Sequence, residues 1–326
     1  MRFNTLDGLR GIAAILVLLY HLGPFSPIRI PGGYLAVDLF FALSGFVLAH
    51  AYDARLRDSM PLREFVLLRL VRVYPMAFVG AVIGVVLSGR FFESLLLLPN
   101  LEGMAVRYPE LAPLYPGNGP MWSLALELLA NLVFALVIVR LGWRGLTTLI
   151  LASGAIFLAG GLTYGLAELG AFWQTIGFGL ARTLFSFSLG VAMHRLHLRL
   201  AIRRRETKLA WLLPIALILV TLQVSATDTA WNLASAFVLL PLILWFGTIW
   251  EAPRTRLVEE IGGLSYPLYC IHGVIVQTCN GMGGSPGYLW ALLIAAAWWL
   301  NTRIDVPLRR HLLTLLNRHR AAPAAA

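Results

Sequence analysis

The feature that most constrains this chain is a series of ten apolar segments, separated by arginine clusters or by turns that contain glycine and proline. About 20 apolar residues of helix cross a bilayer core, and most of the segments approach that length. The 326 residues are 59% hydrophobic and 13% charged, which excludes a water-soluble domain and a disordered chain. The segments cover residues 7–23, 33–50, 73–90, 120–140, 145–165, 172–194, 209–225, 230–250, 261–279 and 286–303.

The predicted fold class is therefore all-α, a polytopic integral membrane bundle of about ten transmembrane helices. Cytoplasmic loops of membrane proteins carry an excess of arginine and lysine. With the N-terminus placed inside, most of the 26 basic residues fall in cytoplasmic loops or in the tail, so we expect both termini in the cytoplasm. Residues 1–305 are expected to form one membrane-embedded domain, and residues 306–326 a basic and then alanine-rich cytoplasmic tail.

Composition and missing motifs exclude several classes of function. Two cysteines, Cys270 and Cys279, offer neither a disulfide framework nor a thiolate metal site, and we expect no metal. The net charge of +10 lies between apolar segments, where it suits lipid and phosphate groups rather than nucleic acid. The chain has no Walker loop and no His-Glu-x-x-His pattern, so ATPase and metalloprotease functions lose support.

Arg10 and His21 stand eleven positions apart in the first segment. At about 100° per residue they return to within roughly 20° of one helix face, after a rise of about 16 Å. Asp7, Ala14 and Val17 share this stripe, along which a narrow channel could run. Ionisable groups inside a membrane indicate function. An arginine that snorkels and a histidine at headgroup level are about equally good explanations.

Asp38 and Ser44 lie in the second segment, where Asp38 reaches a depth comparable to that of His21. A carboxylate at this depth could orient the imidazole or raise its basicity. The alternative is a packing role, in which Asp38 makes a hydrogen bond to a neighbouring helix.

Three further ionisable residues lie deep in later segments, namely Glu127, Arg182 and His272. They could serve catalysis or satisfy one another as buried structural pairs, since an unpaired arginine at the middle of a span is too costly. Candidate donors toward a developing oxyanion are Trp122, Ser123, Tyr266 and Arg182.

Arg69 and Arg72 share a helix face at the inner end of the third segment. Two guanidinium groups so placed suit a phosphate group. The positive-inside excess by itself is an alternative explanation of these two residues.

Together these segments resemble the type 3 acyltransferase family of membrane proteins. The resemblance covers most of the chain, and its specificity comes from the order of the motifs. The matching residues are Leu6-Asp7-Gly8-Leu9-Arg10-Gly11 with His21, Gly33 to Phe46 with Asp38, Phe40-Phe41 and Ser44-Gly45, Arg69, Arg72, Tyr74 and Pro75, Trp122-Ser123 with Glu127, Arg182 to Gly190, and Ser265-Tyr266 with Tyr269 and His272.

The resemblance implies an O-acyltransferase that moves an acyl group, commonly acetyl, from cytoplasmic acyl-CoA to a hydroxyl of a carbohydrate or glycosylated acceptor. It makes His21 the catalytic histidine, with Arg10 as its partner in donor handling. The expected catalytic residues are His21, Arg10, Asp38 and Glu127, the expected acyl-CoA-binding residues are Arg10, Arg69, Arg72, Tyr74, Trp122, Ser123 and Arg182, and the further intramembrane polar residues are Ser44, Tyr266 and His272.

The sequence leaves two questions open, namely the catalytic mechanism and whether the protein is an enzyme or a transporter. Neutral His21 could act as a general base, or it could form a covalent acyl-histidine. A transporter or flippase would also place ionisable residues inside the membrane. No tightly bound cofactor is expected, and acetyl-CoA or another acyl-CoA is the expected donor substrate. A chain rich in arginine and alanine with one lysine suggests a bacterium and hence its inner membrane.

Overall fold

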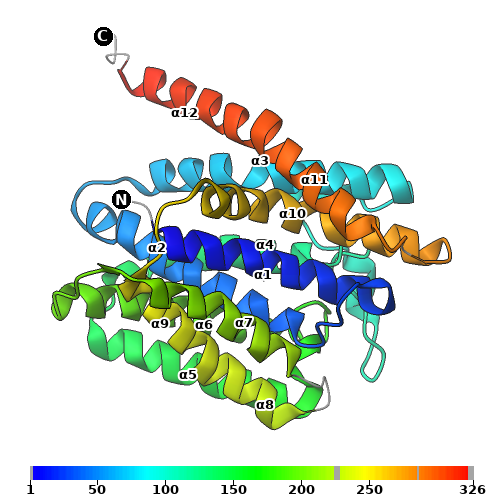
Figure 1. The fold of residues 1–326 in the computed structure, drawn as a ribbon, viewed down its shortest axis with the longest axis horizontal. Helices are drawn as coiled ribbons and strands as arrows, with labels where there is room; N and C mark the ends of the chain where they lie inside the picture. Colours follow the sequence, from blue (N-terminus) through cyan, green and yellow to red (C-terminus); the bar gives the residue numbers. More distant parts are fainter. Residues whose placement is uncertain (1–2, 224–227, 285, 322–326) are drawn as a thin grey trace.

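A computed structural model describes residues 3–223, 228–284 and 286–321, and these residues form an almost entirely helical bundle (Figure 1). Two pairs of helices are continuous through π-helical turns, α8 with α9 through Ser235–Leu239 and α11 with α12 through Asn301–Asp305. The helices are α1 (Asn4–Leu22), α2 (Ala36–Asp58), α3 (Leu62–Ser88), α4 (Met121–Leu136), α5 (Trp143–Tyr164), α6 (Ile176–Arg199), α7 (Leu212–Leu222), α8 (Thr229–Ala234), α9 (Leu240–Ile249), α10 (Arg256–Gly281), α11 (Leu289–Leu300) and α12 (Val306–Ala321).

The prediction of an all-α membrane protein is confirmed. Each of the ten apolar segments contains a helix within the described residues, and seven helices among these residues are long and apolar enough to cross a membrane. Ten transmembrane spans and cytoplasmic termini stay predictions. Some bounds differ from the expected ones, because charged residues do not interrupt a helix whose backbone bonds are satisfied internally. Thus α3 already begins at Leu62, and the basic part of the tail continues as α12 to Ala321, while residues 322–326 lie outside the described ranges.

Small residues allow the central helices to approach closely. A side chain at Gly45 of α2 would stand 2.0 Å from the carbonyl oxygen of Phe187 in α6, and one at Gly190 of α6 would stand 2.0 Å from that of Ala42 in α2. Glycine therefore permits the contact between α2 and α6, as is common in membrane bundles. Helix α1 packs against α2, α7, α9, α10 and α11 and runs through the middle of Figure 1.

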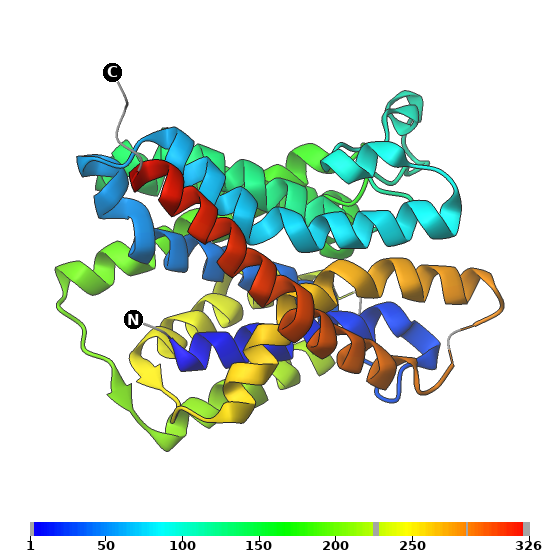
Figure 2. The same ribbon diagram turned by 90° about the horizontal axis from the view of Figure 1, so that it is seen from above.

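The start of α1 lies at the same end of the molecule as the end of α12 and a short β pairing. The start of α1 and the end of α12 lie toward the same end of the molecule in both views (Figures 1 and 2). At this end a short parallel pairing joins β1 (Arg205–Glu206) to β2 (Trp250–Glu251), an addition to the predicted all-α fold. The hydroxyl of Thr5 donates to the carbonyl of Trp250, which fixes the start of α1 against β2.

Candidate active site

A cavity of about 330 Å³ lies beside the first half of α1, between α1, α2, α3, α4 and α10. Its lining combines apolar residues such as Val37, Phe40 and Leu43 with polar ones, and Val47 and His50 of the lining are exposed. The volume falls within the range of small-molecule sites, which is roughly 300–1,000 Å³. The polar lining residues are Asp7, Arg10, Ser44, His50, Arg69, Arg72, Ser123, Glu127, Ser265, Tyr266 and Tyr269.

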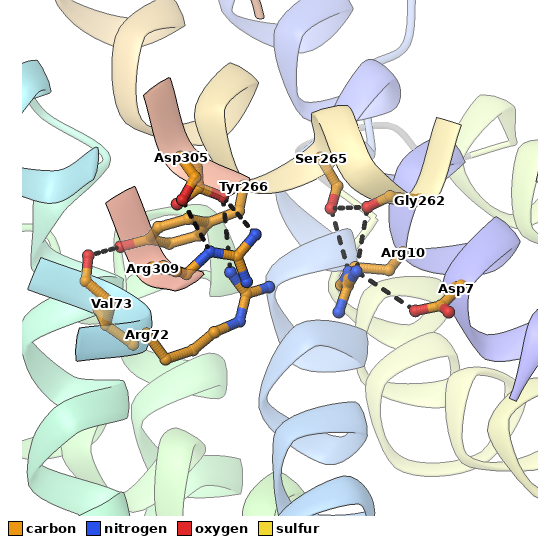
Figure 3. Close-up of polar contacts among 9 residues, drawn as sticks. All are labelled: Asp7, Arg10, Arg72, Val73, Gly262, Ser265, Tyr266, Asp305 and Arg309. Atoms are coloured by element: carbon orange, nitrogen blue, oxygen red, sulfur yellow. Dashed lines mark hydrogen bonds and ion pairs between the residues drawn. The ribbon is translucent and has the colours of Figure 1, made fainter. Parts of the chain in front are cut away.

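Arg10 is fixed in the cavity wall by α10. Its Nε donates to the Ser265 hydroxyl at 3.0 Å, and its Nη2 donates to the Gly262 carbonyl at 3.0 Å (Figure 3). Asp7 lies one turn earlier in α1, with a carboxylate oxygen 3.3 Å from the Arg10 guanidinium. These contacts fix the direction of the guanidinium, while a third of the side chain stays exposed.

Arg69 of α3 and Glu127 of α4 form a pair in the lining of the cavity. The distance between Nη2 and Oε1 is 3.7 Å, and the same Oε1 accepts a hydrogen bond from the Ser44 hydroxyl at 2.7 Å. Arg72 lies one turn further along α3, with its guanidinium carbon 5.4 Å from the centre of the Tyr266 ring. The structure thus brings together predicted residues from four segments far apart in the sequence.

The expected channel from Arg10 to His21 is not open. The cavity lining includes Asp7 and Arg10 but neither Ala14 nor Val17, which are both buried. The reason is close helix packing, since a side chain at Gly11 would stand 2.3 Å from that of Ile261 in α10. Gly11, which lies next to this stripe, lets α1 and α10 come together, so that no passage is left between them.

His21 lies at the far end of α1 and meets His272 of α10. The two rings are 5.0 Å apart between centroids, and His21 Nδ1 is 3.4 Å from His272 Nε2. Each Nδ1 also contacts the carbonyl four residues earlier, that of Val17 at 2.8 Å and that of Leu268 at 3.0 Å. Since only a protonated nitrogen can donate to a carbonyl, these contacts assign the proton to Nδ1 in both rings. The Nε2 of His21 is then left as an acceptor, on a half-buried side chain.

Tyr269 lines the cavity and contacts His272 of the histidine pair; it is among the residues that carry the family resemblance but not among the predicted site residues. Its hydroxyl is 2.6 Å from that of Ser123, and the centre of its ring lies 5.5 Å from the ring centres of both Phe40 and His272. The three-residue spacing from Tyr269 to His272 places both on one face of α10, which is the signal that could have revealed it.

Asp38 does not contact His21, contrary to expectation. Both of its carboxylate oxygens bind Arg182, at 2.8 Å to Nε and 2.7 Å to Nη2. Both side chains are almost fully buried. The side chain that orients His21 is therefore His272. Asp38 instead has the alternative role, that of a packing residue bonded to a neighbouring helix.

Arg182 is likewise not a cavity residue. Beyond its bidentate bond to Asp38, it donates to the carbonyls of Leu166, Leu169 and Tyr34. A buried guanidinium requires this many acceptors, and their number leaves it poorly placed to bind acyl-CoA or an oxyanion.

Two other expected donor-binding residues also lie outside the cavity lining. The Tyr74 hydroxyl donates to the Leu95 carbonyl at 2.8 Å, which fastens α3 to the following connection. The Trp122 ring packs against Phe41 at 6.2 Å. Among the described residues, no group of three or more histidine, cysteine, aspartate or glutamate side chains could hold a metal ion.

Comparison with known proteins places these residues in a family context. A family model described as an acyltransferase domain matches residues 3–300. Protein 2 in the picA locus of Rhizobium radiobacter is 35% identical over 48% of this chain and 93% of its own length. The peptidoglycan O-acetyltransferase OatA of Listeria monocytogenes is 31% identical over 53% of this chain, but over only 28% of its own length. The acyltransferase MdmB of Streptomyces mycarofaciens is 26% identical over the whole chain and 95% of its own length. No solved structure matches significantly.

Proposed function

The chain belongs to the acyltransferase family whose model matches residues 3–300, and we propose that it transfers an acyl group from acyl-CoA to a hydroxyl of a carbohydrate or glycosylated acceptor. The observation that carries this proposal is that the two ends of α1 hold different functional groups. Arg10 lies in a cationic cavity at one end, and His21 with an unprotonated Nε2 lies at the other.

The cavity has the charge that a coenzyme A donor requires. Arg10, Arg69 and Arg72 line it against two carboxylates, Asp7 and Glu127. Coenzyme A carries phosphate groups, and guanidinium groups bind phosphate through paired, charge-assisted hydrogen bonds. The donor is a substrate in this proposal, and its acyl-pantetheine arm would run along the apolar lining residues toward Ser123 and Tyr269.

The chemistry at His21 follows from its tautomer. Nε2 accepts the proton of the acceptor hydroxyl while the hydroxyl oxygen forms a bond to the thioester carbonyl carbon. The carbon–sulfur bond then breaks, and the thiolate of CoA leaves and takes up the proton. During this step the imidazolium is stabilised through Nδ1 by the Val17 carbonyl and by the lone pair of His272 Nε2. We thus favour the general-base mechanism over one with an acyl-histidine intermediate. If rapid denaturation traps an acyl-histidine, the general-base mechanism is contradicted.

Tyr269 lines the cavity and contacts His272, and in this proposal its ring has to move before a thioester reaches His21. A closed barrier of this kind keeps water away from the reactive thioester until the acceptor binds. His21, being half-buried at the end of α1 away from the cavity, would receive the acceptor from the opposite side.

The acceptor class and location rest on the relatives and on charge. One relative is named a peptidoglycan O-acetyltransferase, which favours a carbohydrate acceptor and an acetyl group here. The arginine-rich loops support a cytoplasmic position of the cavity in a bacterial inner membrane, where acyl-CoA is available.

Purified protein in detergent, incubated with radiolabelled acetyl-CoA and a panel of sugars, tests the proposal. We expect free CoA and a labelled sugar with wild type, a loss of both with His21→Ala, and no loss with His311→Ala, which changes an exposed histidine of α12. Flux of a solute across vesicles without CoA binding or any labelled product would instead favour a transporter.

A further inference from the structure

We propose that Asp305 is a positioning residue that fixes Arg72 for binding of the donor phosphates, an inference that rests on the proposed function. Asp305 lies outside residues 3–300, the part that the family model matches. It belongs to the π-helical turn between α11 and α12, and its side chain is only 1% exposed. A buried carboxylate in such a turn is costly unless cations balance it.

Two arginines from different helices converge on this carboxylate (Figure 3). Arg309, one turn later in α12, donates through Nη2 to Oδ2 at 2.7 Å. Arg72 of α3 brings its Nη1 to 3.8 Å from the same oxygen. The longer distance is an electrostatic contact without a hydrogen bond, so Asp305 attracts Arg72 without using its donors.

Arg72 is held by two contacts and stays open toward the cavity. Asp305 lies at its Nη1, the Tyr266 ring lies beneath the guanidinium, and the Tyr266 hydroxyl donates to the carbonyl of Val73. About a third of the side chain is exposed, and Arg72 lines the cavity. Without the carboxylate, Arg72 and Arg309 would repel each other, and Arg72 would lose its fixed direction.

The π-helical turn explains how Asp305 reaches this position. A π turn adds one residue, which rotates everything after it by about 100° relative to a regular α-helix. Asn301, at the start of the turn, packs directly on Gly263 of α10, where a side chain would stand 2.7 Å from the amide nitrogen. The turn thus presses against α10 next to Gly262, which binds Arg10, and α12 packs against α3.

Titration of acetyl-CoA and of S-acetylpantetheine, which has no phosphates, into the purified full chain tests the inference. We expect Asp305→Asn to weaken acetyl-CoA binding about tenfold and to leave S-acetylpantetheine binding unchanged. Because Asp305 acts through Arg72, the substitution should have no further effect in an Arg72→Gln background. Asp53→Asn is the matched control, since Asp53 also bridges two arginines, Arg57 and Arg195, but neither of these arginines lines the cavity.

The outcomes separate this inference from the proposed function. If wild type and Asp53→Asn do not bind acetyl-CoA, both ideas fail. If they bind it and Asp305→Asn binds equally well, only the inference fails. Equal weakening with and without Arg72, or equal weakening for S-acetylpantetheine, would also overturn it. Should Asp305→Asn unfold, Asp305→Glu replaces it, with an affinity expected between wild type and Arg72→Gln because the charge is kept but displaced.

Discussion

His21 Nδ1 and His272 Nε2 lie 3.4 Å apart, although the residues are separated by 251 positions in the sequence. With both protons assigned to Nδ1, His272 presents a lone pair to the proton-bearing side of His21. A neutral imidazole thus occupies the place beside the proposed base where we expected the carboxylate of Asp38. This arrangement fixes the tautomer of His21 without placing a charge next to it.

Substitution of His21 by alanine is expected to lower kcat by about 10²- to 10⁴-fold, the usual contribution of a general base. The Michaelis constant for acetyl-CoA should change little, because the cavity does not include His21. Steady-state kinetics with detergent-purified protein check both values. Wild-type turnover in a folded His21→Ala protein would refute the assignment.

Replacing His272 by alanine should reduce kcat roughly ten- to hundredfold, the range for loss of one hydrogen bond to a charged group. His272→Gln, which restores an acceptor on a longer side chain, should recover part of this loss. The comparison is made at saturating donor. Equal activities of the two variants would show that the lone pair of His272 has no role.

Asp38→Leu should destabilise the protein by about 3–5 kcal/mol, because it leaves Arg182 buried without its counter-ion. Thermal unfolding in detergent measures the change. The double variant Asp38→Leu with Arg182→Met should be more stable than Asp38→Leu alone, since it removes the uncompensated charge. If the double variant is the less stable one, the pair does not have the structural role assigned to it.

Removal of the Tyr269 ring should open the barrier between cavity and histidines. We expect Tyr269→Ala to raise the release of CoA in the absence of any acceptor, because water then reaches the thioester. Tyr269→Phe keeps the ring, loses only the contact with Ser123, and should show little such leakage. A thiol assay measures the CoA released by both variants without an acceptor. Equal release by the two variants would show that the ring does not act as a barrier.

The Michaelis constant for acetyl-CoA should rise with ionic strength, because salt screens the attraction between the donor phosphates and the three cavity arginines. S-acetylpantetheine, which carries no phosphate, provides the control and should show little dependence. Kinetics at two salt concentrations check this, and an identical salt response for both donors would argue against phosphate binding in the cavity.

The sequence by itself determined the membrane bundle and much of the cavity. In lipid, a long apolar segment can satisfy its backbone hydrogen bonds within itself only as a helix. Helical spacing then places Arg10 and His21 on one face of α1. The sequence predicts Glu127 as a site residue because an ionisable group deep in a membrane is costly without a purpose, and Arg69 and Arg72 because two guanidinium groups on one helix face suit a phosphate.

Only the tertiary structure decided which of these charges meet. Asp38 was expected beside His21, yet Arg182 takes both of its oxygens, and His272 takes the place by His21. Helical periodicity fixes the direction of a side chain from its own axis but not the rotation of one helix against another. Those rotations depend on contacts such as that of Gly45 with α6, and on the π turn that brings Asp305 to Arg72. Partners separated by hundreds of residues are therefore set by packing, which the local pattern does not encode.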